Sequence, residues 1–192
     1  AYVFYHRHTH GTQYSRQDCA EEVTIDPDGT IHQAEITSQG LNGGPLDPAK
    51  EIPAYSCCRL RAKEGILHFS SRTPWNECHP RLVQETPNGV PTSSCLYIEN
   101  LRDGAEAGYK YLAFKGTEKL LEAEVRGDAE GTLVAHLDGP DREVVAELAI
   151  APSDGWHRVA APRPAAITGT HALYFVFEEK GALDFDAFRF AE

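Results

Sequence analysis

The sequence predicts an all-β protein, an antiparallel β-sandwich of the jelly-roll type preceded by a short strand and a β-hairpin. Three observations favour this class. Apolar and polar residues alternate with a period of two in many short runs, which is typical of strands with one face in a core. Gly, Pro, Asp and Asn separate these runs at regular intervals, and helix signals are almost absent. We therefore divide the chain into a strand-and-hairpin segment, residues 1–56, and a sandwich, residues 57–192.

The first segment begins with an apolar run at residues 2–7 (YVFYHR). Residues 22–25 and 31–36 flank the sequence DPDG at 26–29, where Pro and Gly supply turn geometry, so we expect a hairpin. Residues 39–50 are rich in chain-breaking residues and poor in core residues, which is typical of a connector.

The second segment contains strand patterns at short, regular spacing. Apolar residues alternate with polar ones in residues 121–126, 132–137 and 144–150. Residues 171–178 (HALYFVFE) are apolar on both faces, as expected of a central strand, and residues 185–190 (FDAFRF) close the chain. Strands at this spacing predict a sandwich or barrel.

Composition and charge exclude several classes of partner. The 192 residues carry a net charge of −11, and Lys and Arg are scattered along the chain. Nucleic-acid binding needs a basic patch, and anionic membranes repel an acidic surface. No apolar run approaches the roughly 20 residues of a membrane-spanning helix. We therefore expect a neutral or cationic partner, with no nucleic acid and no membrane.

The cysteines indicate no structural zinc site. Their spacing matches no CxxC pair, and their odd number leaves at least one thiol unpaired if disulfides form. The sequence leaves open whether one disulfide forms among the five: Cys19, Cys57, Cys58, Cys78 and Cys95.

The second segment resembles family 6 carbohydrate-binding modules over roughly residues 60–192. The resemblance rests on the order and spacing of several pieces. These are YIEN at 97–100, DG at 103–104, GYKY at 108–111, VRG at 125–127, DGW at 154–156, VAAP at 159–162, GTHALYFVF at 169–177 and the closing FDAFRF. Such modules are β-sandwiches that bind plant or microbial polysaccharides and often hold a structural calcium ion.

The first segment resembles the closing part of glycoside hydrolase family 43. The similar pieces are residues 4–9 (FYHRHT), residues 15–20 (SRQDCA), the hairpin, and residues 37–40 (TSQG). That family has a five-bladed propeller, acts on arabinose- and xylose-containing polymers, and often continues into a family 6 module. The resemblance implies the C-terminal portion of such an enzyme, extracellular or periplasmic. Its partners would be a polysaccharide or oligosaccharide and a catalytic propeller domain or chain.

The chain by itself is expected to be inactive as a hydrolase. Glycoside hydrolysis needs two carboxyl groups flanking the scissile bond. In the family that the chain resembles, those acids lie upstream of the part present here. Asp18, Glu21 and Glu22 match no catalytic motif, and we interpret them as solvated strand and turn charges.

Four residues are candidates for carbohydrate binding, because such sites stack aromatic rings on sugars and hold hydroxyls with polar groups. The resemblance places Trp156 at a framework tryptophan rather than at the sugar-clamping one. It puts Gly108 where an aromatic clamp is expected, with Tyr109 next along. Asp184 falls where the family commonly has a sugar-bonding Asn. Trp75 lies in a loop, where it would be a binding residue if exposed and a plug if buried. We expect the usual cleft to be degenerate and leave open a second site on the sheet face.

Two positions are candidate metal ligands. Asp186 matches a carboxylate that helps to hold structural calcium in the module family, and the alternative is a turn carboxylate paired with Arg or a backbone amide. Calcium takes six to eight oxygen ligands, so one Asp is only a start. His6, His8 and His10 alternate and would share one strand face, where imidazoles bind transition metals. The family match falls on His6, near the propeller axis, and the alternative is ordinary polar residues at a strand end.

Three functional hypotheses follow. In the first, the chain is a carbohydrate-binding or structural accessory portion of a plant-polysaccharide-degrading glycoside hydrolase. In the second, it is one half of a split or cleaved active arabinofuranosidase or xylosidase. In the third and weaker one, it is a metal-binding protein that uses its N-terminal histidines.

Overall fold

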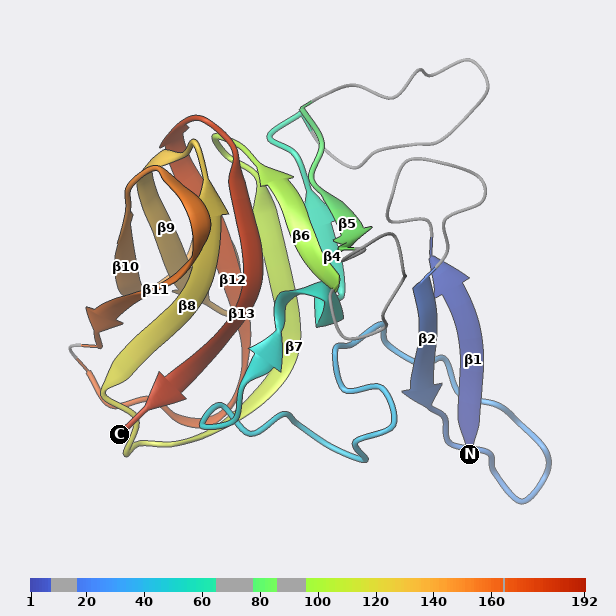
Figure 1. Ribbon diagram of the computed structural model, residues 1–192. Coiled ribbons are helices and arrows are strands. Elements are labelled where there is room, and N and C mark those ends of the chain that lie inside the picture. Colours follow the sequence, from blue (N-terminus) through green and yellow to red (C-terminus); the bar gives the residue numbers. More distant parts are fainter. Residues whose placement is uncertain (8–16, 65–77, 86–95, 164) are drawn as a thin grey trace, which may run out of the picture.

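The computed structural model describes residues 1–7, 17–64, 78–85, 96–163 and 165–192. Within them the protein is a β-sandwich with a separate two-stranded ribbon at one side (Figure 1). The ribbon pairs β1 with β2, one sheet has the order β10-β9-β12-β7-β4, and the other has the order β11-β8-β13-β6-β5 with β3 added on β13. The predicted all-β sandwich is thus confirmed.

The element bounds follow the chain in order. They are β1 (Tyr2–Arg7), β2 (Gln17–Glu22), β3 (Ile52–Pro53), the 3₁₀ turn η1 (Ala54–Ser56), β4 (Arg59–Arg61), β5 (Arg81–Gln84), β6 (Leu96–Leu101), β7 (Glu106–Lys115), β8 (Leu120–Gly127), β9 (Glu130–Leu137), β10 (Val144–Ile150), β11 (Ser153–Pro162), β12 (Thr168–Lys180) and β13 (Leu183–Ala191).

Aromatic side chains fill the space between the two sheets. Phe175 of β12 lies edge-on to Phe185 and Phe188 of β13, with ring centroids 5.1 and 4.9 Å apart. Tyr109 of β7 joins them, 4.7 Å from Phe188. These contacts link a strand of each sheet through edge-to-face pairs, which aromatic rings prefer.

A β-bulge lies in β13 where it pairs with β8. The register shifts between Phe185 and Ala187, which leaves Asp186 as the extra residue. Because of this shift, Phe185 and Phe188 both point into the core although they are three residues apart.

The connector is attached to the sandwich along much of its length. Leu46 forms a parallel bridge with Leu112 of β7. Ile52 pairs with Phe188 of β13, and both Ile52 and Ala54 are buried in the sandwich core. Residues before position 57 therefore contribute to the sandwich, and the boundary at 56/57 stays a prediction.

The predicted hairpin is present as a short antiparallel pairing around its turn. Gly29 donates a hydrogen bond to the Asp26 carbonyl, and Ile25 and Ile31 form an antiparallel bridge whose flanking hydrogen bonds run from Asp26 to the Thr30 carbonyl and from His32 to the Thr24 carbonyl. The regular strand of this region is β2, which precedes the turn. It forms because it pairs with β1 along its whole length, from Tyr2 opposite Glu22 to Arg7 opposite Gln17.

Glu21 is a buried structural residue rather than the solvated charge that we expected. Its side chain accepts hydrogen bonds from the Tyr5 hydroxyl at 3.0 Å and from the Thr37 amide and hydroxyl at 2.8 and 2.7 Å. These contacts satisfy a carboxylate that is only 5% exposed. They tie residues 31–37 to β2 through a side chain instead of a strand ladder.

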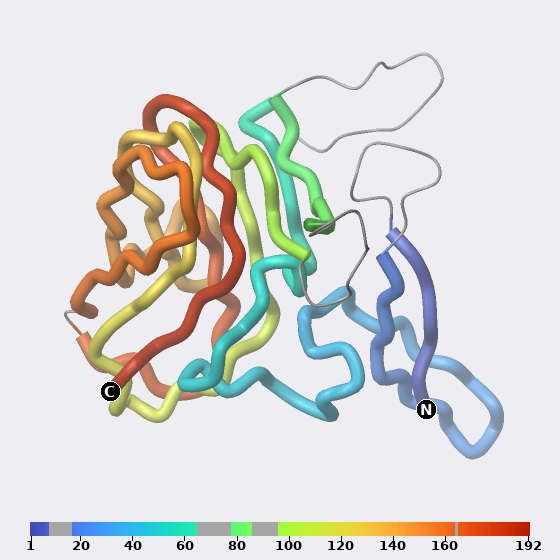
Figure 2. Tube along the Cα trace, in the orientation of Figure 1, coloured from blue at the N-terminus to red at the C-terminus, as the bar shows by residue number. Residues whose placement is uncertain are grey.

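The two ends of the chain lie at opposite sides of the view in Figure 2, with the N-terminus on the ribbon and the C-terminus on the sandwich.

All four cysteines in the described ranges (Cys19, Cys57, Cys58 and Cys78) are free, and Cys95 lies outside those ranges. No helix in the part of the chain that the structure describes is long and apolar enough to span a membrane.

Phe175→Ala should lower the free energy of unfolding by about 3–5 kcal/mol, because it removes a fully buried ring from the centre of the core. Urea unfolding followed by circular dichroism measures the loss. The matched control is Phe4→Ala, which truncates a ring that is 70% exposed and should change stability by less than about 0.5 kcal/mol. Equal losses in the two variants would contradict this account of the core.

Candidate functional site

The outer face of the sheet that contains β8 and β13 carries a cluster of four side chains, which we call the Arg126 cluster: Arg126, Tyr97, Trp156 and Asp184. Strand alternation places them there. Val125 and Phe185 point into the core, so their neighbours Arg126 and Asp184 point outward. Arg126 and Asp184 are also direct cross-strand partners, a position where opposite charges stabilise a sheet.

Arg126 occupies the faces of both aromatic rings in the cluster. Its guanidinium carbon lies 4.2 Å from the Trp156 ring centroid and 4.8 Å from that of Tyr97. The two rings lie edge-on to each other, with centroids 5.2 Å apart. A cation at these distances is attracted to an aromatic face, and it covers one face of each ring against a stacked sugar.

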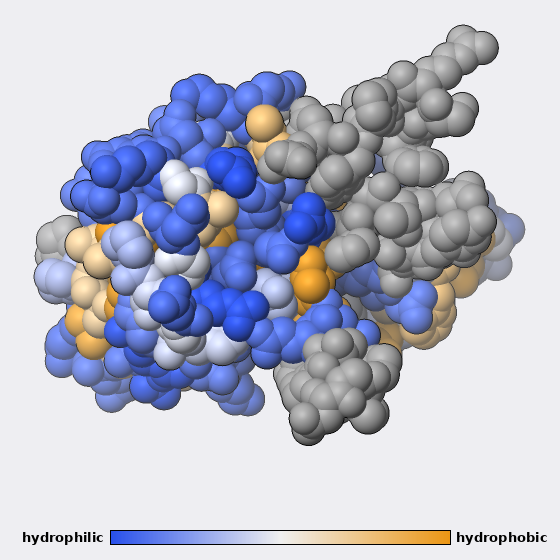
Figure 3. All heavy atoms as spheres, turned by 45° about the horizontal axis from the view of Figure 1, so that its top comes forward, coloured by the Kyte–Doolittle hydropathy of each residue, from blue (hydrophilic) through white to orange (hydrophobic). Residues whose placement is uncertain are grey.

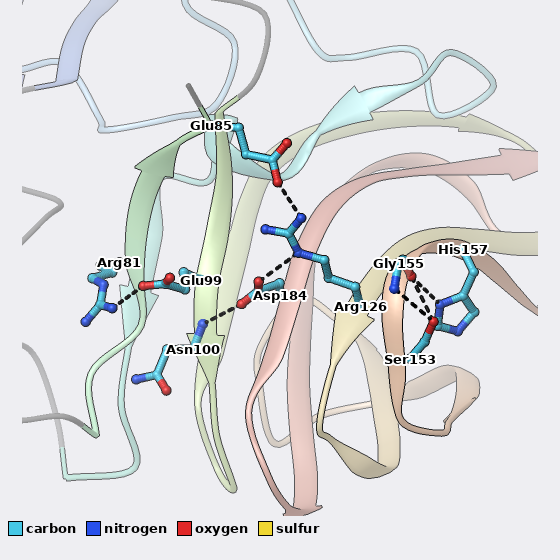
Figure 4. A network of polar contacts seen from close by, with 9 residues as sticks. All are labelled: Arg81, Glu85, Glu99, Asn100, Arg126, Ser153, Gly155, His157 and Asp184. Carbon is cyan, nitrogen blue, oxygen red and sulfur yellow. Dashed lines mark hydrogen bonds and ion pairs between the residues drawn. The ribbon is translucent and has the colours of Figure 1, made fainter. Parts of the chain in front are cut away.

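Carboxylates on both sides hold the guanidinium in place (Figure 4). Nε of Arg126 donates to Asp184 at 3.1 Å, and Nη1 contacts Glu85 at the end of β5. The other oxygen of Asp184 accepts a hydrogen bond from the Asn100 amide at 3.3 Å. Arg126 is therefore held by one carboxylate from β13 and one from the end of β5.

Burial is the largest influence on the pKa values of Asp184 and Tyr97. It raises the pKa of Asp184 above the usual Asp value, against the opposing effects of Arg126 and the Asn100 amide. It also raises the pKa of the Tyr97 hydroxyl, with a further contribution from the Asp184 charge. Keeping the Asp184 carboxylate ionised therefore costs desolvation energy, and the ion pair with Arg126 offsets part of that cost.

A hollow of about 480 Å³ opens beside the cluster. We call it the acidic hollow, because three carboxylates contribute to its wall. Its lining is Arg126, Gly127, Asp128, Pro152, Ser153, Asp154 and Asp184. Carboxylate and hydroxyl oxygens of this kind accept hydrogen bonds from sugar hydroxyls, so the hollow suits a neutral, hydroxyl-rich ligand held by polar contacts.

Tyr109 is not a sugar-binding residue in this structure, and that expectation was wrong. Its ring is fully buried in the core, and its hydroxyl donates to the Ala54 carbonyl at 2.8 Å. The neighbouring Gly108 has no room for a side chain, since a Cβ there would lie 2.7 Å from the Tyr174 ring. An aromatic clamp at position 108 would therefore require Tyr174 to move.

The metal candidates are not brought together. Asp186 is half-buried at the β-bulge, and burial raises its pKa, with Glu124, Glu51 and Glu85 adding to the effect. No group of three or more His, Cys, Asp or Glu residues able to hold a metal occurs in the described ranges. Asp186 alone does not supply the six to eight oxygen ligands that calcium takes, and the calcium ion stays a prediction.

Other candidates lie partly or wholly outside the described residues. His6 is an exposed residue of β1, opposite Asp18. Its expected companions His8 and His10 fall outside the described ranges, as does Trp75.

The sequence reasoning missed Arg126 and Tyr97 as site residues. Arg126 lies in VRG and Tyr97 in YIEN, two pieces that carry the family resemblance, but nothing in either piece predicts that the two residues meet. Their contact depends on the order of β11, β8, β13 and β6 in the sheet, which no local pattern encodes.

Comparison with known proteins extends over nearly the whole chain. No family model matches. A xylosidase/arabinosidase of Thermoclostridium stercorarium is 36% identical over 188 residues, which is 97% of this chain. The chain spans about two fifths (39%) of that relative's length.

Solved structures show the same fold at low sequence identity. A Bacillus subtilis arabinoxylan arabinofuranohydrolase of glycoside hydrolase family 43 is 18% identical, with a TM-score of 0.63, over 92% of this chain and 34% of its own. A family 6 carbohydrate-binding module of Clostridium cellulolyticum, in complex with xylose, is 16% identical, with a TM-score of 0.59 over 77% of this chain and all of its own. A β-1,3-glucan-binding family 6 module of Bacillus halodurans gives a TM-score of 0.60 at 16% identity over 78% of this chain and all of its own. The sandwich therefore has the fold of a family 6 module.

Arg126→Gln should lower the free energy of unfolding by about 1–3 kcal/mol at pH 7, because it leaves the Asp184 carboxylate half-buried without its cation. The loss should shrink as the pH falls. With its pKa raised by burial, Asp184 takes up a proton in the folded state at a higher pH than in the unfolded chain, and protonation favours folding through that window. Chemical denaturation between pH 7 and pH 4 measures both effects.

Lys180→Gln is the control for this variant, since it breaks only the exposed Lys180–Glu130 pair and should leave the free energy of unfolding nearly unchanged. A loss in Arg126→Gln that did not change with pH would show that Asp184 does not depend on Arg126.

Proposed function

We propose that this chain is the carbohydrate-binding accessory portion of a glycoside hydrolase that acts on arabinose- and xylose-containing plant polysaccharides. The observation that carries the proposal is a single continuous similarity to a xylosidase/arabinosidase, which runs through the ribbon, the connector and the sandwich. The fold of the sandwich supports the same role. An enzyme of this kind meets its polymer outside the cytoplasm, so we propose an extracellular or periplasmic location.

The acidic hollow is the surface that we assign to neutral sugar. Arg126 covers the Trp156 and Tyr97 faces, so binding there depends on hydrogen bonds to hydroxyls rather than on a stacked ring. Few polar contacts without stacking give modest affinity, as suits a module that keeps an enzyme near a polymer instead of locking it in place.

A second candidate function is favoured by the apolar surface of the ribbon. Large hydrophobic side chains are exposed on β1 and within residues 25–36; they are Tyr2, Val3, Phe4, Ile25, Ile31 and Ile36. Figure 3 shows hydrophobic atoms on the side of the molecule where the ribbon lies, as well as smaller hydrophobic areas on the sandwich. An exposed two-stranded ribbon of this kind is unstable without a partner. We propose that it docks on a catalytic propeller and that activity belongs to that assembly.

The chain should be retarded in native gels that contain arabinoxylan, xylan or arabinan, relative to gels without polysaccharide. Asp184→Ala should weaken binding to the retarding polymer about tenfold, because it removes an acceptor in the acidic hollow worth about 1–1.5 kcal/mol. The control is Asp141→Ala, an exposed carboxylate outside the hollow that should leave retardation unchanged. Absence of retardation with all three polymers would reject carbohydrate binding.

The native assembly should contain a polypeptide portion of propeller size associated with this chain. Light scattering, with mass spectrometry of the components, measures the mass of that assembly. Phe4→Ser and Ile31→Ser should each weaken the association, because they place a hydroxyl among the exposed apolar side chains of β1 and residues 25–36. If the chain runs alone at its own mass, or if both variants associate as well as the parent, docking through the ribbon is rejected.

A further inference from the structure

A second hollow, of about 620 Å³, lies between residues 33–36 and the outer face of the sheet that contains β4, β7 and β12. We call it the cationic hollow. Its lining is Arg7, Gln33, Ala34, Glu35, Ile36, Cys58, Arg59, Leu60, Arg61, His79, Pro80, Lys110 and Tyr174. Four of these residues are Arg or Lys and one is acidic, although the whole chain has 29 acidic residues against 18 Lys and Arg. The local charge is thus opposite to that of the protein.

Two of the four cations are neutralised by carboxylates. Lys110 pairs with Glu35 at 2.6 Å, and Arg59 pairs with Glu106 at 2.8 Å. These pairs fix the wall of the hollow and leave Arg7 and Arg61 as its remaining positive charges.

Arg7 and Arg61 have no carboxylate partner among the described residues. Arg7 donates to two neutral oxygens, the Gln17 side chain at 2.7 Å and the Cys57 carbonyl at 2.6 Å. In the described part of the chain, Nε of Arg7 and Nε of Arg61 are both buried without a hydrogen-bond acceptor. Buried donors left without an acceptor are costly and uncommon in folded proteins, and here two of them belong to residues that line one hollow.

The chemistry of the lining selects the ligand. Guanidinium groups bind planar carboxylates through paired N–H donors. Ile36, Leu60 and Tyr174 add apolar surface beside the charges, which suits the C–H face of a sugar ring. A volume of about 620 Å³ lies within the range of small-molecule sites. A polyanion is disfavoured by the net charge of −11, whereas one carboxylate on a largely neutral polymer is not.

We propose that the cationic hollow binds the carboxylate of an acidic sugar unit, a uronate substituent on the polysaccharide. This inference rests on the proposed function, because it assumes that the chain meets a polysaccharide. The two hollows then bind different units of the polysaccharide. The acidic hollow, with Asp128, Asp154 and Asp184 in its wall, repels a carboxylate and takes neutral sugar, while the cationic hollow takes the charged unit.

The test is titration calorimetry of the whole chain with a xylo-oligosaccharide carrying one glucuronic acid, against the same oligosaccharide without it. The acidic ligand should bind at least tenfold more tightly, and added salt should reduce the difference. Arg61→Gln should abolish the difference while leaving the melting temperature unchanged or higher, because the Arg61 side chain makes no hydrogen bond or ion pair within the described residues and its backbone pairing with β7 is kept. The control is Arg158→Gln, an exposed arginine on the other sheet that pairs with Glu51, Glu122 and Glu124 and should preserve the difference.

Equal affinity for the two ligands, or a preference that survives in Arg61→Gln, would overturn the inference. Displacement of the acidic ligand by inorganic sulfate at equal concentration would identify a general anion site and would also overturn the assignment to an acidic sugar. Failure here is separate from failure of the proposed function, which the neutral polymers test through the acidic hollow.

Discussion

Burial of one aromatic cluster between two sheets is the constraint on which the rest of the structure depends. Phe175 from one sheet and Phe185 and Phe188 from the other are fully or almost fully buried and touch edge to face. The β-bulge at Asp186 makes this possible, because it lets two core rings occur three residues apart on one strand. The same bulge determines which residues of β13 face outward, so core packing and the position of Asp184 have one cause.

The outer faces of the two sheets then differ in charge. On one face Arg126 is bound by Asp184 and Glu85 and lies over two aromatic rings, which leaves a polar surface with acidic groups. On the other face, beneath residues 33–36, Arg7 and Arg61 remain without carboxylates among the described residues. A sandwich offers two surfaces over a common core, and in this protein the hollows on them have linings of opposite charge.

The ribbon and connector link the sandwich to what lies beyond it. Leu46 joins the connector to the sandwich, Ile52 and Ala54 after it are buried in the core, and Glu21 holds Thr37 against β2. The ribbon nevertheless keeps a row of exposed apolar residues, which folding of this chain alone does not bury. The ribbon is thus attached to the sandwich on one side and exposes apolar side chains on the other, where a hydrophobic partner can pack.

The sequence by itself determined the fold class, the sandwich strands β8, β9, β10, β12 and β13, and the family resemblance, because alternation with a period of two is a local signal of burial. It predicted the turn at Asp26–Gly29 correctly, since Pro and Gly act within a few residues. It failed for β2 and for Glu21, whose places depend on β1 and Thr37, partners that are distant in sequence. It failed for Tyr109 because alternation does not state which of two adjacent residues faces the core. Only the tertiary structure brought Arg126 to Trp156 and Arg7 to Arg61, because sheet order and layer packing decide which side chains from separate strands share a surface.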